Sequence, residues 1–154
     1  RFEIGSEPEK WDPQTRETAD HSLAYILAVT LVDGEISLES FDLERVEDPA
    51  LRPLMQKISV SVDPATRELE SPRQPVRFEI CLKNGDIIEE ACEYPFGHPM
   101  NPAGSAMVSE KFMALAERTV DADAAVDLLS ILRELADASD LGQLTNAMRK
   151  LPVH

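Results

Sequence analysis

The chain has 154 residues, 43% of them hydrophobic, and a formal net charge of −14. This length and composition predict a globular protein with one hydrophobic core and additional helices. The acidic charge argues against nucleic acid and anionic membrane surfaces as partners, because both reward clustered Lys and Arg.

The start of the chain, its apolar stretches and its cysteines indicate the compartment in which we expect the protein. No stretch reaches the ~20 apolar residues of a membrane span, and the start, Arg1 to Gly5, is not a signal peptide. We therefore expect a cytoplasmic protein. Because residue 1 is Arg, we expect a piece of a longer chain. Cys81 and Cys92 are predicted to be reduced thiols on different faces of neighbouring strands.

The first predicted element is a helix from His21 to Val32. Nearly all of its residues are apolar, which predicts burial on most sides. Ser22 or Asp20 can cap its first turn, and Asp33-Gly34 ends it.

The start of this helix is a candidate anion site. We expect free backbone N–H groups and the positive end of the helix dipole beside His21, which would attract carboxylates and lower the pKa of the imidazole. Tyr25, four residues further on, is predicted to share the face of His21.

Shorter elements follow in the first half of the chain. Residues 43–46 and 49–55 are predicted to form two short helical pieces, divided at Asp48-Pro49. Alternation of apolar and polar residues from Ile58 to Val62 predicts a strand. The polar, proline-containing segment 64–75 is predicted to be an exposed loop.

A hairpin is predicted around Asn84-Gly85. The apolar residues match best across the two strands when the loop has three residues and ends at Gly85 with a positive φ. Ile88, Cys92 and Tyr94 then lie on the face of Phe78 and Ile80, only Glu90 is misplaced, and Tyr94 points inward.

The last part of the chain is predicted to be a rigid loop followed by helices. Residues 94–102 contain three prolines and a glycine, so this loop presents side chains such as His98. Ser105 is predicted to cap one helix and Asp121 a second, and a third covers about 141–151. The fold class is therefore α+β: a small antiparallel sheet with a hairpin packed against helices, followed by carboxy-terminal helices.

Histidine is the natural acid or base for chemistry beside a carboxylate. Of the three, His154 is terminal, while His21 and His98 lie in ordered surroundings. Each candidate also has an ordinary structural interpretation. His21 can be a solvated or capping residue, Tyr25 and Tyr94 core residues, Asn101 a turn residue and Lys111 a solvated helix residue. No metal-ligand spacing or phosphate-binding glycine loop is present, which leaves a cofactor-free anion site.

Several ordered blocks resemble the carboxy-terminal half of the MmgE/PrpD family, from about Glu7 to about Leu151. They are listed here in chain order: Trp11-Asp12-Pro13, Thr15-Arg16-Glu17-Thr18-Ala19-Asp20-His21-Ser22, Tyr25, Asp33-Gly34, Tyr94-Pro95, Gly97-His98-Pro99, Asn101-Pro102 and Lys111-Phe112. The family includes 2-methylcitrate dehydratase, cis-aconitate decarboxylase and iminodisuccinate epimerase.

The resemblance implies a smaller α+β lid, here residues 1–119, that closes over a large amino-terminal helical domain. Residues 120–154 would be helices that pack back on that domain. It also implies a small di- or tricarboxylate substrate in the cleft between the domains, no metal or organic cofactor, and a homodimer. Without the helical domain, the chain is expected to be inactive, since positioning supplies much of the barrier reduction.

The resemblance also suggests roles for particular residues. His21 would transfer a proton or bind a carboxylate, with Tyr25 and Tyr94 orienting groups or donating hydrogen bonds. His98 and Asn101 would line the mouth of the cleft, and Arg16 and Lys111 would be electrostatic supports. A 2-methylcitrate dehydratase-type lyase is the preferred activity. Decarboxylase or epimerase activity, or a non-catalytic module acting in association, is the alternative.

Overall fold

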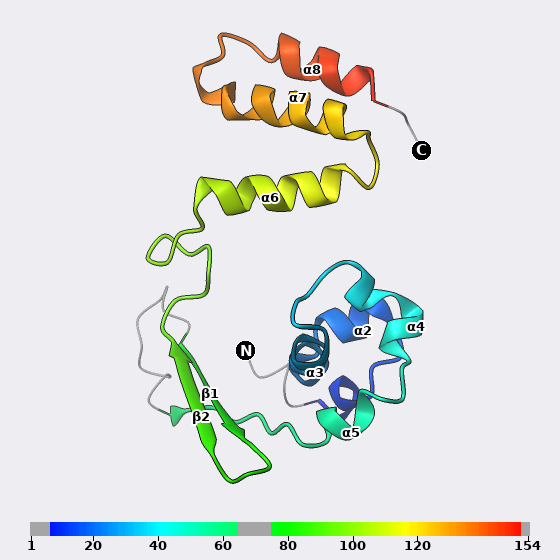
Figure 1. The fold of residues 1–154 in the computed structure, drawn as a ribbon, viewed down its shortest axis with the longest axis vertical. Coiled ribbons are helices and arrows are strands. Elements are labelled where there is room, and N and C mark those ends of the chain that lie inside the picture. The colour runs from blue at the N-terminus through cyan, green and yellow to red at the C-terminus, as the bar shows by residue number, and fades with distance from the viewer. Residues whose placement is uncertain (1–6, 65–74, 152–154) are drawn as a thin grey trace. The chain divides into compact units, whose positions relative to one another are not determined.

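The computed structural model describes residues 7–64 and 75–151, and the chain divides into two compact units, Arg1–Glu70 and Ser71–His154. The α+β class is confirmed (Figure 1). The first unit contains, in order, η1 Pro8–Trp11, α2 Arg16–Asp20, α3 Leu23–Asp33, η2 Glu39–Phe41, α4 Leu43–Val46 and α5 Arg52–Met55. The second contains β1 Val76–Cys81, β2 Ile87–Cys92, α6 Ser105–Ala116, α7 Ala122–Arg133, η4 Leu135–Asp137 and α8 Gly142–Arg149.

Helix α3 is the centre of the first unit. It begins at Leu23 because the Ser22 side chain accepts a hydrogen bond from the backbone N–H of Tyr25, and it ends at Gly34 in the left-handed conformation. Of the two caps considered, Ser22 is therefore the correct one, and the predicted end is confirmed. The predicted start at His21 is wrong, because His21 ends α2 instead.

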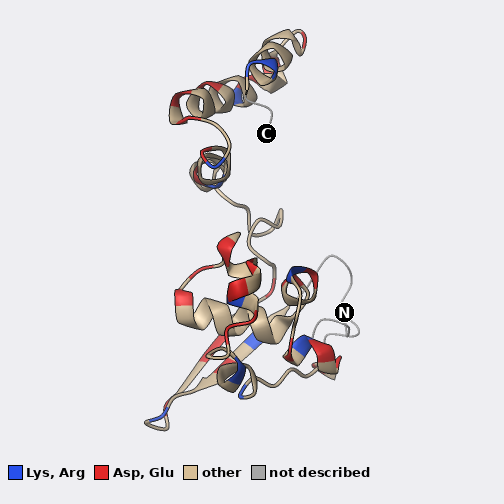
Figure 2. Ribbon diagram, turned by 90° about the vertical axis from the view of Figure 1, so that its right-hand side faces the viewer, with Lys and Arg blue, Asp and Glu red and all other residues tan. Residues whose placement is uncertain are grey.

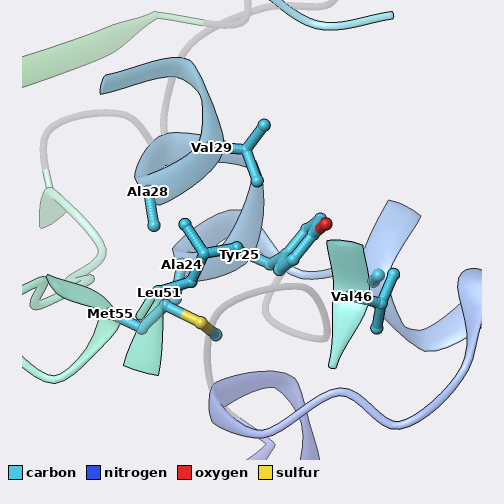
Figure 3. Close-up of a cluster of buried hydrophobic side chains, with 8 residues drawn as sticks. Ala24, Tyr25, Ala28, Val29, Val46, Leu51 and Met55 are labelled. Atoms are coloured by element: carbon cyan, nitrogen blue, oxygen red, sulfur yellow. The ribbon is translucent and has the colours of Figure 1, made fainter. Parts of the chain in front are cut away.

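The core of the first unit forms around the buried side of α3 (Figure 3). Ala24 and Ala28 are small enough to let Leu51 and Met55 approach the helix closely. Trp11, Phe41, Leu54 and Ile58 are partly buried and pack against this cluster.

Three arginines connect segments of the first unit by hydrogen bonds. Arg16 donates to Asp42 and to the Phe41 carbonyl, Arg45 to Asp33 and Asp48, and Arg52 to Asp12 and the Pro13 carbonyl.

Two predictions in this unit need correction. The strand expected from Ile58 to Val62 is absent, because the segment bonds to no strand among the described residues and leaves Val60 and Val62 exposed. A strand requires a neighbour as well as an alternating pattern. The helical piece expected at 49–55 begins only at Arg52, whereas 43–46 is confirmed. Most of the predicted loop 64–75 lies outside the described residues.

The hairpin of the second unit has the predicted register. Ile80 pairs with Ile88 and Val76 with Cys92, and Phe78 faces the misplaced Glu90. The Gly85 N–H donates to the Leu82 carbonyl, and Gly85 has φ +91, which only glycine adopts without strain. Both cysteines are free thiols, and by the strand register they lie on opposite faces.

The carboxy-terminal helices follow in the order α6, α7, α8, each packed on the next. Asp121 caps α7 by accepting from the Ala124 N–H, as predicted. Ser105 is not a cap. Gly104 occupies that position, and Ser105 is the first residue of α6. The predicted domain boundary at residue 119 stays a prediction.

Replacing Ser22 should destabilise the chain far more than replacing Ser105. We expect Ser22→Ala to cost about 1 to 2 kcal/mol, because α3 loses its cap and the Lys10 carbonyl loses a hydrogen-bond donor. Ser105→Ala should change the stability by less than about 0.5 kcal/mol. Urea unfolding followed by circular dichroism checks both values. Equal losses in the two variants would contradict the assignment of the caps.

Candidate functional site

His21 lies where two helices meet. It is the C-cap of α2 and directly precedes Ser22, the cap of α3. Its Nδ1 lies 3.1 Å from the Glu17 carbonyl oxygen and also contacts the Asp20 carboxylate. Both groups are acceptors, so Nδ1 carries a proton and donates it to them. The lone pair of the neutral ring is therefore on Nε2, and the side chain is 63% exposed.

This setting raises the pKa of His21 above its ordinary value of 6.5. The hydrogen bond to Asp20 is the largest cause, followed by the bond to the Glu17 carbonyl and the charge of Asp20. The lowered pKa expected from the α3 dipole is wrong. The Asp20 carboxylate and the carbonyl end of α2 both favour the protonated ring, and they act at shorter range than the dipole of the next helix.

A shallow depression of about 320 Å³ surrounds this histidine. It is lined by Lys10, Glu17, Thr18 and His21. The Ser22 hydroxyl donates to the Lys10 carbonyl and so brings the segment before α2 to the start of α3. Lys10 and a protonated His21 supply positive charge to the depression, and Glu17 opposes it. Lys10, Glu17 and Thr18 were missed as candidates, although Glu17 and Thr18 belong to the same sequence block as His21 and Lys10 directly precedes Trp11.

Tyr25 and Arg16 lie on the same unit but do not line this depression. Tyr25 has no exposed surface, and its hydroxyl donates to the Ser40 carbonyl. Burial raises the pKa of this hydroxyl above its ordinary value of 10.0. Tyr25 therefore does not share a face with His21, because α3 begins two residues after the histidine. Arg16 is engaged with Asp42 at 2.9 Å and with the Phe41 carbonyl at 3.0 Å.

The second unit brings together three of the predicted residues. Tyr94 and His98 stack with ring centroids 4.8 Å apart and planes 26° from parallel. Asn101 Nδ2 donates to the Tyr94 carbonyl at 3.0 Å. All three are half-buried. Gly97, with φ +88, makes the turn that lets the chain fold back on itself.

Lys111 is exposed on α6, ten residues after Asn101 in the sequence. The predicted site residues thus fall into two groups. Arg16, His21 and Tyr25 lie in the first unit, and Tyr94, His98, Asn101 and Lys111 in the second. The roles expected for these residues stay predictions.

Residues 7–64 and 75–151 carry more acidic than basic side chains. Acidic side chains occur along helices of both units, with fewer Lys and Arg between them (Figure 2). No group of three or more His, Cys, Asp and Glu in these ranges could hold a metal ion. None of the helices in these ranges combines the length and apolar character needed to cross a bilayer.

The sequence matches the MmgE/PrpD C-terminal domain over residues 1–137. Because this match covers most of the chain, the chain belongs to the MmgE/PrpD family. The resemblance seen in the ordered motifs is confirmed.

Individual relatives differ in activity. The chain is 26% identical to cis-aconitate decarboxylase of Mus musculus over 89% of its own length and 28% of the relative. It is 29% identical to cis-aconitate decarboxylase of Aspergillus terreus over 93% of this chain and 31% of the relative. It is 30% identical to 2-methylcitrate dehydratase of Cupriavidus necator over 60% of this chain and 20% of the relative. The chain spans less than a third of the length of these relatives.

Removing the carboxylate beside His21 should lower the pKa of this histidine. We expect Asp20→Asn to move it back toward 6.5, and Asp137→Asn, which removes the same charge elsewhere, to leave it unchanged. A pH titration followed by NMR of the imidazole measures both. A raised pKa that survives in Asp20→Asn would show that the Asp20 bond is not its main cause.

The same shift sets the sign of a stability effect. A raised pKa means that the folded chain binds the proton more tightly than the unfolded chain. The stabilisation is therefore complete below pH 6.5 and is lost as the pH rises through the raised pKa.

Proposed function

We propose that this chain is the lid part of a cofactor-free lyase that acts on a small di- or tricarboxylate, with 2-methylcitrate dehydratase-type activity. The observation that carries the proposal is an exposed imidazole with a fixed Nδ1–H and an open Nε2, beside Lys10, in a chain of the MmgE/PrpD family. We also propose a cytoplasmic homodimer with a role in propionate catabolism.

Dehydration of a β-hydroxy acid needs a base, an acid and charge stabilisation. The base takes a proton from the carbon next to a carboxylate, and the electron pair left behind forms the C=C bond. The hydroxyl on the next carbon then leaves with a proton as water. We propose that the neutral His21 Nε2 takes the carbon-bound proton, because Nδ1–H is engaged with Asp20 and Glu17 and the free lone pair is on Nε2.

The other predicted residues would act around this proton transfer. Tyr94, His98 and Asn101 would hold substrate oxygens, and Lys111 would supply positive charge. Arg16 and Tyr25 would act through their neighbours, since both already bond within the first unit. We propose that an amino-terminal helical domain supplies the rest of the pocket, which is supported by the chain covering 20–31% of the length of three relatives.

A decarboxylase is the second candidate, because the similarity to the mouse cis-aconitate decarboxylase covers 89% of the chain and that to the bacterial dehydratase 60%. In this reaction the bond between the carbon and its carboxylate group breaks and CO₂ leaves. The electron pair and the negative charge stay on the carbon, which then takes a proton. The same residues would then deliver a proton rather than remove one.

The activity can be assigned by assaying the polypeptide that joins this chain to the proposed helical domain. We expect turnover of 2-methylcitrate with release of water, and none by the 154-residue chain alone. Turnover of cis-aconitate or iminodisuccinate instead would assign decarboxylation or epimerisation. Binding without turnover of any of the three would favour a non-catalytic module.

His21→Gln should reduce kcat/KM of that polypeptide by about 100-fold or more, the usual contribution of a general base. Glutamine keeps a polar group of similar size but cannot take up a proton at neutral pH. His154→Gln serves as the control and should leave kcat/KM unchanged. Activity in His21→Gln equal to that of the unsubstituted protein would remove His21 from the mechanism.

A further inference from the structure

The second histidine of interest, His98, is held in a network that fixes the tautomer of its neutral ring. The backbone N–H of Met100 donates to His98 Nδ1 at 3.1 Å. A backbone N–H can only donate, so Nδ1 is the acceptor and has no proton. The single proton of the neutral ring is then on Nε2. This is the opposite tautomer to that of His21, whose Nδ1 donates to two oxygens.

The surrounding loop holds the ring in place. The His98 N–H donates to the Pro95 carbonyl at 3.0 Å, and the Asn101 N–H donates to the His98 carbonyl at 2.7 Å. The Gly97 N–H closes the turn by donating to the Asn101 carbonyl at 2.8 Å. These bonds fix the backbone on both sides of His98, and Met100 fixes the torsion of the side chain.

Tyr94 fixes the plane of the ring. It stacks on one face of the imidazole, and its carbonyl is held by Asn101 Nδ2 at 3.0 Å and by Cys92 Sγ at 2.8 Å. Stacking covers a face of the ring and leaves its Nε2–H edge uncovered, because hydrogen bonds of imidazole lie in the plane. His98 is half-buried, so part of its side chain reaches solvent.

We propose that His98 binds a carboxylate of the substrate as a neutral donor through Nε2–H and does not transfer protons. Nε2 has no lone pair to accept a proton, and the lone pair of Nδ1 is used by Met100. A carboxylate oxygen is an acceptor only, and it matches this single fixed donor. The inference rests on the proposed function, because that function supplies the carboxylate-bearing substrate.

The tautomer of His98 can be tested without an activity assay. Long-range ¹⁵N–¹H NMR spectra of the 154-residue chain distinguish the two tautomers of each histidine, and His21→Gln and His98→Gln variants assign the signals. We expect His98 as the Nε2–H tautomer and neutral His21, at a pH above its pKa, as the Nδ1–H tautomer in the same sample. A proton on Nδ1 of His98 would overturn the inference.

The role as a donor can be tested with two substitutions in the polypeptide that carries the helical domain. The amide of glutamine reaches the position of Nε2 and can donate there, whereas the shorter asparagine cannot. We expect His98→Gln to keep KM within about 3-fold, and His98→Asn to raise KM by about 10- to 100-fold with kcat nearly unchanged. A loss of kcat in His98→Gln as large as in His98→Ala would show proton transfer by His98 and overturn the inference.

Binding of a non-reacting probe separates this inference from the proposed function. Calorimetry with propane-1,2,3-tricarboxylate should rank the affinities as the KM values do. We expect His98→Gln to bind the probe about as tightly as the unsubstituted protein, and His98→Asn to bind it more weakly. Such binding without turnover of any substrate would contradict the proposed function and support the inference. Equal affinity of all three proteins for the probe would overturn the inference even if the enzyme were active.

Discussion

The Ser22 hydroxyl is the group on which the arrangement of the first unit depends. It accepts from the Tyr25 N–H and donates to the Lys10 carbonyl, so one side chain both starts α3 and attaches the preceding segment. Because α3 starts after Ser22, Tyr25 turns into the core and bonds to the Ser40 carbonyl, while His21 stays outside. The exposed histidine, its lysine neighbour and the buried tyrosine are three consequences of this one cap.

Features set by local chemistry could be predicted from the sequence. The hairpin register followed from matching apolar residues around Gly85, and it includes the unfavourable position of Glu90 opposite Phe78. The Asp121 cap followed from a short polar side chain before an apolar run, and Ser22 was one of the two caps considered for α3. The Ile58–Val62 strand failed because alternation reports only a suitable pattern, and pairing depends on a partner that local sequence does not reveal.

Of the four residues that line the depression, only His21 was selected from the sequence. His21 was found, but the direction of its pKa was not, because the sequence suggested one helix end where two meet. The Asp20 contact reverses the expected effect, and it depends on where α2 stops. Lys10 was passed over because it becomes a neighbour of His21 only through the Ser22 bond to its carbonyl.

The acidic charge of the chain limits how it can bind an anion. In residues 7–64, Arg16, Arg45 and Arg52 each bond to carboxylates of the chain itself, so their charges are already compensated. A neutral donor carries no such liability, since it attracts no carboxylate of its own and loses little solvation on binding one. Capture of a polycarboxylate by this family member would then combine oriented neutral donors such as His98 with cations from the proposed helical domain.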